Sequence, residues 1–263
     1  MSTNIYMSKN DIRRCIKIPD KLTHDLAEII GIVVGDGHVR IGNDGYRINI
    51  SGHSLDDKQY FENHVIPLFW KVFNLKPHIK INGNEFDLVF SSKAATLFFR
   101  NDLNFPANKN LITVPTVIEN APLAMKARFL RGFMDTDFSV MFKRKYREFH
   151  YYPIINGASV SKDLMLSISK MFTRFNIPNY LYHRSYIDKR SNKKAEIHHI
   201  YVSGIAGLND VIRMIGFSNP KHLTKIEIWK KYGFYPPLIT AKDRDDIIKG
   251  IKDPRIFYGP GRI

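Results

Sequence analysis

The chain has 263 residues, enough for one large domain or two ordinary ones, and its 44% hydrophobic content excludes a disordered chain. Forty Lys and Arg against 25 Asp and Glu give a formal net charge of +15, which favours a polyanionic partner, chiefly nucleic acid, over an ordinary basic enzyme or a membrane-surface protein. A single cysteine, Cys15, excludes a disulfide framework and a cysteine-based zinc site. No long apolar run and no N-terminal signal region is present, so we expect a soluble intracellular protein without a membrane partner, cytoplasmic in a prokaryotic-type cell or in an organelle.

Two apolar segments, roughly 100 residues apart, resemble each other. Residues 26–38 read LAEIIGIVVGDGH, and residues 129–139 read FLRGFMDTDFS. Both predict helices that end at an acidic residue, with Thr23 and Pro122 as start signals and Gly37 as a stop for the first helix. The repeat predicts two copies of one structural unit.

The segments after the two runs follow one common order of strands and helices. Polar–apolar alternation predicts half-buried strands, and Asn82-Gly83 predicts a hairpin turn. In the first half we expect strands at residues 46–51, 77–82 and 85–90 and helices at about 55–73 and 94–101. In the second half we expect strands at 151–158, 180–186 and 197–202 and helices at 162–175 and about 208–215.

Each half is therefore expected to have the order αββαββα, which gives an α+β protein of two pseudo-symmetric halves. The expected boundaries are residues 1–104 for the first half, 105–120 for a linker and 121–237 for the second half. Residues 238–263 form a C-terminal extension to which the pattern assigns no structure.

Residues 29–37 (IIGIVVGDG) and 130–138 (LRGFMDTDF) resemble the paired LAGLIDADG motifs of a family of homing endonucleases. The resemblance extends from about residue 18 to 237 and includes SSK at 91–93 and GFSNPK at 216–221. It implies a monomer in which the two motif helices pack together and two curved antiparallel sheets form a saddle over double-stranded DNA. It also implies Mg²⁺-dependent cleavage of both strands of a long target, as in intron homing, with short 3′ overhangs.

Small residues in the two motif helices indicate close packing between them. Gly31 and Gly35 lie four residues apart on one helix face, and Gly132 and Thr136 repeat this spacing. Such residues let two helix backbones approach closely. Since a glycine inside a helix costs about 1 kcal/mol relative to alanine, close packing is the expected compensation.

Asp36 and Asp137 fall at the C-terminal ends of the two motif helices, where the helix dipole disfavours a carboxylate. A divalent cation reverses that balance, and paired helices bring the two carboxylates together, as two-metal phosphodiester hydrolysis requires. We expect both aspartates to be catalytic and to share two or three Mg²⁺ ions, with Gly35 and Thr136 in the same metal site.

The second motif departs from the family pattern at Phe138, where the family usually has glycine. This phenylalanine is expected either to change the local packing or to crowd the metal site. Asp135, two residues before Asp137, is expected to be a solvated carboxylate at the helix end rather than a metal ligand.

The family often carries basic or amide residues near the metal ions, and only the first half offers candidates. His53 and Lys93 occupy those places as further catalytic residues, whereas the matching positions of the second half are Val160 and Ile205. Either basic residue could polarise water or stabilise transition-state charge, although both also fit ordinary surface positions. The asymmetry predicts unequal cleavage rates for the two strands.

Polar residues on alternating strands are expected to read base edges in the major groove, and basic loops to contact phosphates. The DNA contacts expected in the first half are Arg40, Arg47, Asn49, His78, Lys80 and Asn82. Those expected in the second half are Lys143, Arg144, Lys145, Arg147, Tyr182, Arg184, Lys189, Arg190, Lys193, Lys194 and His198.

Three other functions remain open at this point. One is a catalytically inactive regulator that binds DNA, and another is a maturase that binds intron RNA. The third, an intein with an embedded endonuclease, is disfavoured because the chain starts at Met1 and ends at Ile263 without splicing residues.

Overall fold

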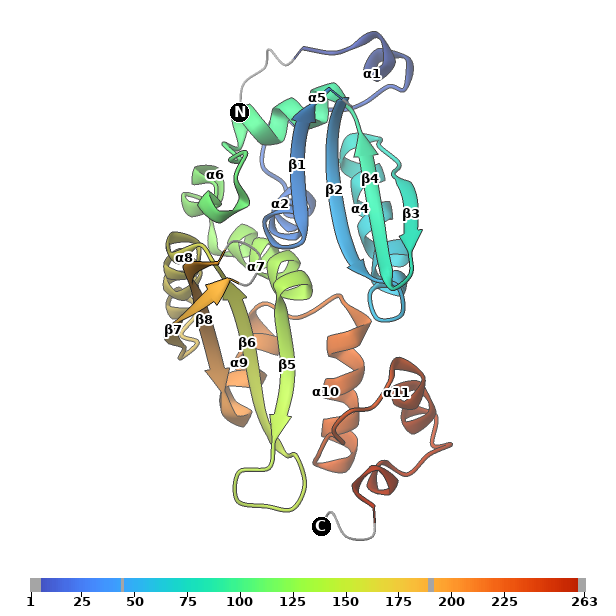
Figure 1. Cartoon of the computed structure of the whole chain (residues 1–263), viewed down its shortest axis with the longest axis vertical. Coiled ribbons are helices and arrows are strands. Elements are labelled where there is room, and N and C mark those ends of the chain that lie inside the picture. Colours follow the sequence, from blue (N-terminus) through green and yellow to red (C-terminus); the bar gives the residue numbers. More distant parts are fainter. Residues whose placement is uncertain (1–5, 44, 189–191, 260–263) are drawn as a thin grey trace.

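Two similar α+β halves are joined through one pair of helices (Figure 1). The computed structural model describes residues 6–43, 45–188 and 192–259. Helix α2 (His24–Gly35) packs against α7 (Leu123–Asp137), and each helix leads directly into the first strand of its own sheet. The first strands of the two sheets therefore begin close together, where the paired helices end.

Each half contains one four-stranded antiparallel sheet, with the order β1-β2-β4-β3 in the first and β5-β6-β8-β7 in the second. The expected α+β class and the two antiparallel sheets are thus confirmed. The strands are β1 (Gly37–Gly42), β2 (Gly45–His53), β3 (His78–Asn82), β4 (Glu85–Ser91), β5 (Phe138–Lys143), β6 (Tyr152–Ser159), β7 (Tyr180–Asp188) and β8 (Lys193–Ser203).

Helices cover one face of each sheet, and their apolar sides form the core. Besides α2, the helices of the first half are α1 (Lys9–Arg13), α3 (Lys58–Tyr60), η1 (Phe61–Val65), α4 (Ile66–Phe73), α5 (Lys93–Leu97) and η2 (Phe98–Asp102). After the first half come η3 (Lys109–Leu111), α6 (Thr116–Glu119), α8 (Lys162–Arg174), α9 (Gly204–Met214), α10 (Pro220–Tyr232), α11 (Ala241–Ile248) and η4 (Pro254–Tyr258).

The other face of each sheet is left uncovered, and we call it the open face. In β2, Ile48 and Ile50 are fully buried, while Arg47 and Asn49 point to the opposite side, as the period of a strand requires. Figure 1 shows α4 behind the first sheet and α9 behind the second, so both open faces lie on the same side of the molecule. Within the described residues, no helix has the length and apolar character needed to cross a membrane.

Candidate functional site

The two motif helices touch through their backbones. A Cβ atom on Gly31 would overlap the backbone of Phe129, and one on Gly132 would overlap the backbone of Glu28. At the end of the pair, the side chain of Thr136 fills the space that Gly35 leaves open. The small residues noted in the sequence therefore lie where α2 and α7 cross, and they set how close the two helix ends come.

Asp36 and Asp137 lie at these helix ends and act on each other. Asp36 caps α2, and Asp137 is the last residue of α7. Burial raises the pKa of Asp36 to about 6, and burial together with repulsion from Asp36 raises the pKa of Asp137 to about 7. Within the described part of the chain neither carboxylate has a hydrogen-bond or ion-pair partner. Such a pair of carboxylates is suited to a cation.

Two lysines flank the carboxylates, and the sequence pattern assigns neither of them to the metal site. The ammonium group of Lys109, in the linker turn η3, donates to the carbonyl oxygen of Gly35. The ammonium group of Lys221, in the first turn of α10, lies 2.9 Å from Asp57 Oδ1. Both lysines lower the pKa values of Asp36 and Asp137, which places their charges beside the pair.

The two basic residues expected here from the sequence make other contacts. The ammonium group of Lys93 lies over the rings of Tyr6 and Tyr46, at 4.1 and 5.2 Å from their centroids. His53 lies 3.9 Å from Asp56 and accepts from the backbone of Leu55 at 3.4 Å. Neither is among the charged groups that shift the pKa values of the two aspartates.

The other residues expected at the metal site are also engaged. The carbonyl of Gly35 accepts from Lys109, and the hydroxyl of Thr136 donates to the carbonyls of Gly132 and Phe133 within α7. These contacts are typical of helix packing. Among the residues expected at the metal site, only Asp36 and Asp137 have side chains without a hydrogen-bond partner in the described part of the chain.

Asp135 is not the solvated carboxylate that its position suggested. Its side chain is fully buried and accepts from the backbone N–H groups of Ser218 and Asn219 at 2.9 to 3.1 Å. The side chain of Asn219 in turn donates to Asp57 Oδ1, the atom that also accepts from Lys221. Asp135 therefore fixes the loop that positions Lys221.

Phe138 does not crowd the acidic pair. It is 2% exposed, and its ring lies on the helix-covered side of the sheet, against Phe133, Phe172 and the backbone of Gly157. Gly157 is its direct partner across β5 and β6 and has no side chain, so the strand pair accommodates the ring.

The six DNA contacts expected in the first half share the open face. Direct partners in an antiparallel pair point to the same side. Arg40 in β1 is the direct partner of Arg47 in β2, and Asn49 lies two residues further along the same strand. Asn49 and His78 are both direct partners of Val89 in β4, so they point to the same side, and Lys80 and Asn82 follow His78 at two-residue spacing.

In the second half, the prediction that His198 lies on the open face of the sheet is wrong. Tyr182 and Arg184 lie on the open face, together with His199 and Ile197, their partners in β8. The side chain of His198 is 13% exposed and points to the helix side.

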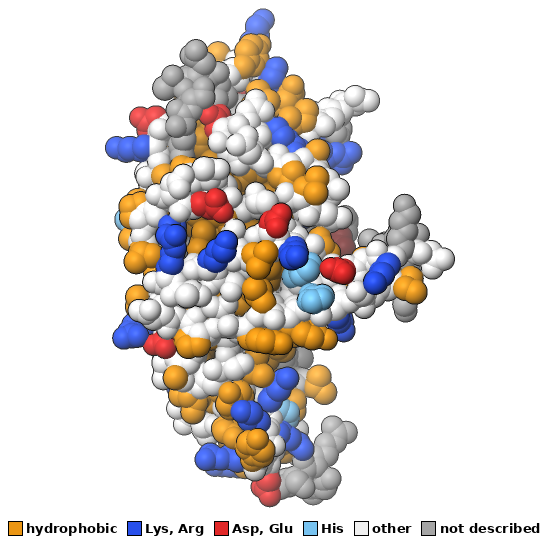
Figure 2. All heavy atoms as spheres, turned by 90° about the vertical axis from the view of Figure 1, so that its left-hand side faces the viewer, with side chains coloured by type: hydrophobic (Ala, Val, Ile, Leu, Met, Phe, Trp, Pro, Cys, Tyr) orange, Lys and Arg blue, Asp and Glu red, His pale blue; other side chains and the backbone are white. Residues whose placement is uncertain are grey.

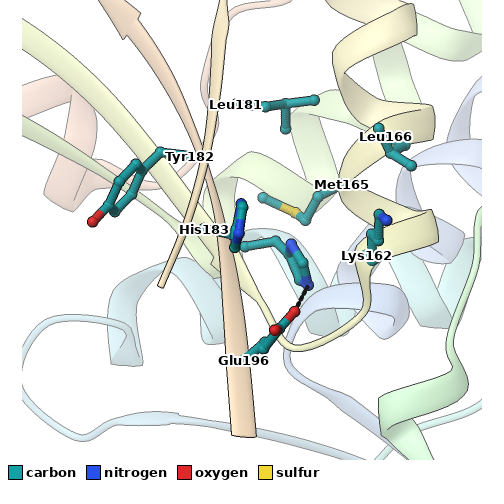
Figure 3. Close-up of a pocket in the computed structure, with 8 residues that line it drawn as sticks. Lys162, Met165, Leu166, Leu181, Tyr182, His183 and Glu196 are labelled. Carbon is teal, nitrogen blue, oxygen red and sulfur yellow. Dashed lines mark ion pairs between the residues drawn. The ribbon is translucent and has the colours of Figure 1, made fainter. Parts of the chain in front are cut away.

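On that side His198 lines a pocket of about 210 Å³ with His183 and α8. Figure 3 shows His183 turned toward this pocket and Tyr182 turned away from it. Lys194 lies on the same side as His198 by register and is exposed. Lys189, Arg190 and the side chain of Lys193 lie outside the described residues.

The basic loop between β5 and β6 is exposed and rests on aromatic rings. Lys145 lies 3.7 Å from the ring centroid of Tyr152, and Arg147 lies 4.7 Å from that of Tyr151. The remaining basic residues of this segment are Lys143 and Arg144, both exposed.

Comparison with known proteins agrees with this geometry. Residues 124–216 match the model of the LAGLIDADG-like domain. A solved structure of I-DmoI in complex with DNA and Ca has a TM-score of 0.54 and 15% identity, covering 78% of this chain and 97% of that one. A structure of mesophilic variants of the homing endonuclease I-DmoI has a TM-score of 0.52 and 16% identity, covering 73% and 95%.

One relative in sequence is named as an aminotransferase and not as an endonuclease. The glutamine–fructose-6-phosphate aminotransferase (isomerizing) of Methanocaldococcus jannaschii is 25% identical over 225 residues, which are 85% of this chain. The match covers only 19% of that protein, so this chain corresponds to about a fifth of its length. Residues 124–216 are thus similar to a LAGLIDADG-like domain, and the chain as a whole has the fold of the LAGLIDADG homing endonucleases.

Proposed function

We propose that this protein is a site-specific endonuclease that cuts both strands of a long double-stranded DNA target with divalent metal ions held by Asp36 and Asp137. The observation that carries the proposal is the pair of partly buried carboxylates, without hydrogen-bond partners in the described residues, at the ends of two helices in backbone contact. The two open faces, which carry the polar residues described above, lie on either side of that pair and would take one half-site each.

The carboxylates fit divalent ions by their chemistry. Oxygen ligands of this kind suit Mg²⁺ in the presence of phosphate, and a bound ion would activate water and neutralise charge on the phosphate. Solved complexes of I-DmoI contain Mn or Ca together with DNA. We therefore propose Mg²⁺ as the cofactor, which Asp36 and Asp137 would hold.

The residues of this chain have separable tasks in such a reaction. Asp36 and Asp137 would hold the metal ions at the helix ends, between the two open faces. Lys109 and Lys221 supply ammonium groups beside them, suited to stabilising the negative charge that develops on the phosphate. Asp57 and Asn219 hold Lys221 in place.

The proposal is tested by selecting duplexes from a randomised library in Ca²⁺ and then adding Mg²⁺. Asp36→Asn and Asp137→Asn are each expected to lower the cleavage rate by on the order of a thousandfold without loss of binding. Asp163→Asn, an exposed carboxylate on α8, is the matched control and should cleave normally. Selection of one sequence without cleavage by the parent protein would identify an inactive DNA-binding regulator. Absence of any preferred duplex would favour an intron RNA.

The aminotransferase relative does not change this assignment. Most of this chain matches one fifth of that protein, so the activity in its name is not transferred. The match instead supports a unit that can also lie within a longer chain, which reopens the embedded-endonuclease arrangement as the context of the same activity.

A further inference from the structure

A basic pocket of about 280 Å³ lies between the end of α6, the first half of α7 and the C-terminal half of α8. Lys126 precedes Asp137 by eleven residues on α7, so the pocket lies about 16 Å along the helix from the carboxylate pair. It is on the helix-covered side of the second sheet, away from the open face. Figure 2 is turned toward α6 and α8 and shows Lys and Arg side chains beside acidic ones on this side. The DNA-cleavage proposal therefore does not use it.

Three cations line this pocket, and within the described residues none of them has an ion-pair or hydrogen-bond partner. Lys126 comes from α7, and Lys170 and Arg174 come from one face of α8, four residues apart. The one carboxylate present, Glu119, accepts from the hydroxyl of Ser167 at 3.2 Å. The pocket thus holds three positive charges against one negative charge.

Lys126 is the most informative of the three because it is only 4% exposed. Burial and repulsion from Arg174 lower its pKa, against the opposing effect of Glu119. A buried cation without a partner is costly, and two neighbouring cations add to that cost. A bound anion would remove it.

We propose that this pocket binds a phosphate group, held by Lys126, Lys170 and Arg174, with Asn120 as a neutral donor. Lysine and arginine with neutral donors are the groups that recognise phosphate in proteins. The volume lies just below the range typical of whole small-molecule ligands, so the pocket suits a phosphate or pyrophosphate group rather than an entire cofactor. The group could belong to a free nucleotide or to a polynucleotide strand.

Isothermal titration with inorganic pyrophosphate at fixed ionic strength tests the proposal. One site per chain is expected, and Lys126→Met and Arg174→Gln should each weaken it by on the order of tenfold or more. Lys162→Met, an exposed lysine on the same helix but outside the pocket, should bind as the parent does. No binding, or equal weakening by Lys162→Met, would overturn the proposal. Because Arg174 is exposed, its variant keeps the test valid even if Lys126→Met fails to fold.

Competition then identifies the source of the phosphate. Displacement of pyrophosphate by ATP at comparable concentration indicates a nucleotide, and displacement only by an RNA or DNA strand indicates a polynucleotide. Both variants should still bind and cut the selected duplex, so loss of this pocket is distinguishable from loss of the endonuclease.

Discussion

At the scale of single residues, the raised pKa values of Asp36 and Asp137 couple metal binding to pH. Both carboxyls must lose their protons to hold a cation, and their pKa values are about 6 and about 7 in the metal-free protein. The affinity for Mn²⁺ should therefore fall as the pH is lowered from 8 through 7 and 6, by up to about tenfold per proton released and per pH unit. Titration calorimetry in buffers of different ionisation enthalpy measures both the Mn²⁺ affinity and the number of protons released on binding.

The same shifts determine how stability changes with pH when no metal is present. In the unfolded chain these carboxyls have a pKa near 3.8 and lose their protons above that pH. In the folded protein they stay protonated up to about pH 6 and pH 7. The free energy of unfolding should therefore fall as the pH rises from about 4 to about 7. Burial also raises the pKa of Asp135 to about 7, so this residue contributes to the same slope. The double variant Asp36→Asn, Asp137→Asn should therefore lose part of the slope and keep the part due to Asp135, and an unchanged slope in that variant would show that the pair does not contribute.

Gly132 tests the backbone contact between α2 and α7, because helix propensity and packing predict opposite changes in stability for Gly132→Ala. Helix propensity alone predicts that Gly132→Ala stabilises the protein by about 1 kcal/mol. Because the new Cβ atom would overlap the backbone of Glu28, we expect destabilisation by about 2–3 kcal/mol instead. Denaturant unfolding measures the difference, and a more stable Gly132→Ala would refute backbone contact between α2 and α7.

At the scale of elements, the sequence predicts most of the fold because the hydrophobic pattern repeats. The expected order αββαββα includes β1 and β5, but the prediction locates neither strand, because each begins directly after its motif helix. The expected helix at 55–73 is real but contains the π-helical turn η1 just before Pro67, whose missing N–H breaks the regular ladder. Helix α10 carries start signals, Asn219 and Pro220, that the repeat comparison passes over.

The site is harder to predict than the fold, since it depends on contacts between distant segments. Asp36 and Asp137 follow from the repeat, but Lys109 is a lone lysine in a linker, and only the packing of η3 brings it to Gly35. His198 and His199 illustrate a different limit. Alternation predicts their strand, but a shift of one residue exchanges the two faces, and the register with β7 decides which histidine faces outward.

The C-terminal extension gives an element-scale prediction about the basic loop between β5 and β6. The hydroxyl of Tyr258 lies 3.0 Å from the backbone N of His150 and 2.9 Å from its Nδ1. The ring of Tyr258 also packs edge-on against that of Phe149, with ring centroids 4.9 Å apart. The extension therefore anchors the end of the loop that carries Arg144 and Arg147.

Tyr258→Ala is accordingly expected to weaken DNA binding by about tenfold, because the loop loses a hydrogen bond and its aromatic support. The cleavage rate at saturating DNA should stay unchanged, since the carboxylate pair lies elsewhere. Tyr232→Phe is the matched control, because among the described residues the Tyr232 hydroxyl donates only to the carbonyl of Ile247, in the extension. A DNA footprint of Tyr258→Ala that shortens on the second half-site alone would support this anchoring role of the extension. Normal DNA affinity in Tyr258→Ala would exclude it.

At the scale of the whole molecule, the net charge of +15 and the two open faces predict binding that depends steeply on salt. If both faces engage one duplex, roughly 6–10 phosphates should be neutralised, and the logarithm of the affinity should fall with the logarithm of salt concentration with a slope of about −5 to −9. Fluorescence anisotropy on the selected duplex measures this slope.

Single substitutions then separate the contacts that position the DNA from those that read it. Arg147→Ala, in the loop between β5 and β6, should weaken binding to all duplexes and make the slope shallower by about one unit. Asn49→Ala, on the open face of β2, should instead relax the sequence preference at one position and leave the slope unchanged, because base contacts release no counterions. Lys162→Ala removes an equal charge from the helix-covered side, outside the basic pocket, and should alter neither quantity. Equal changes in slope for Arg147→Ala and Lys162→Ala would mean that net charge alone, and not the two open faces, governs DNA binding.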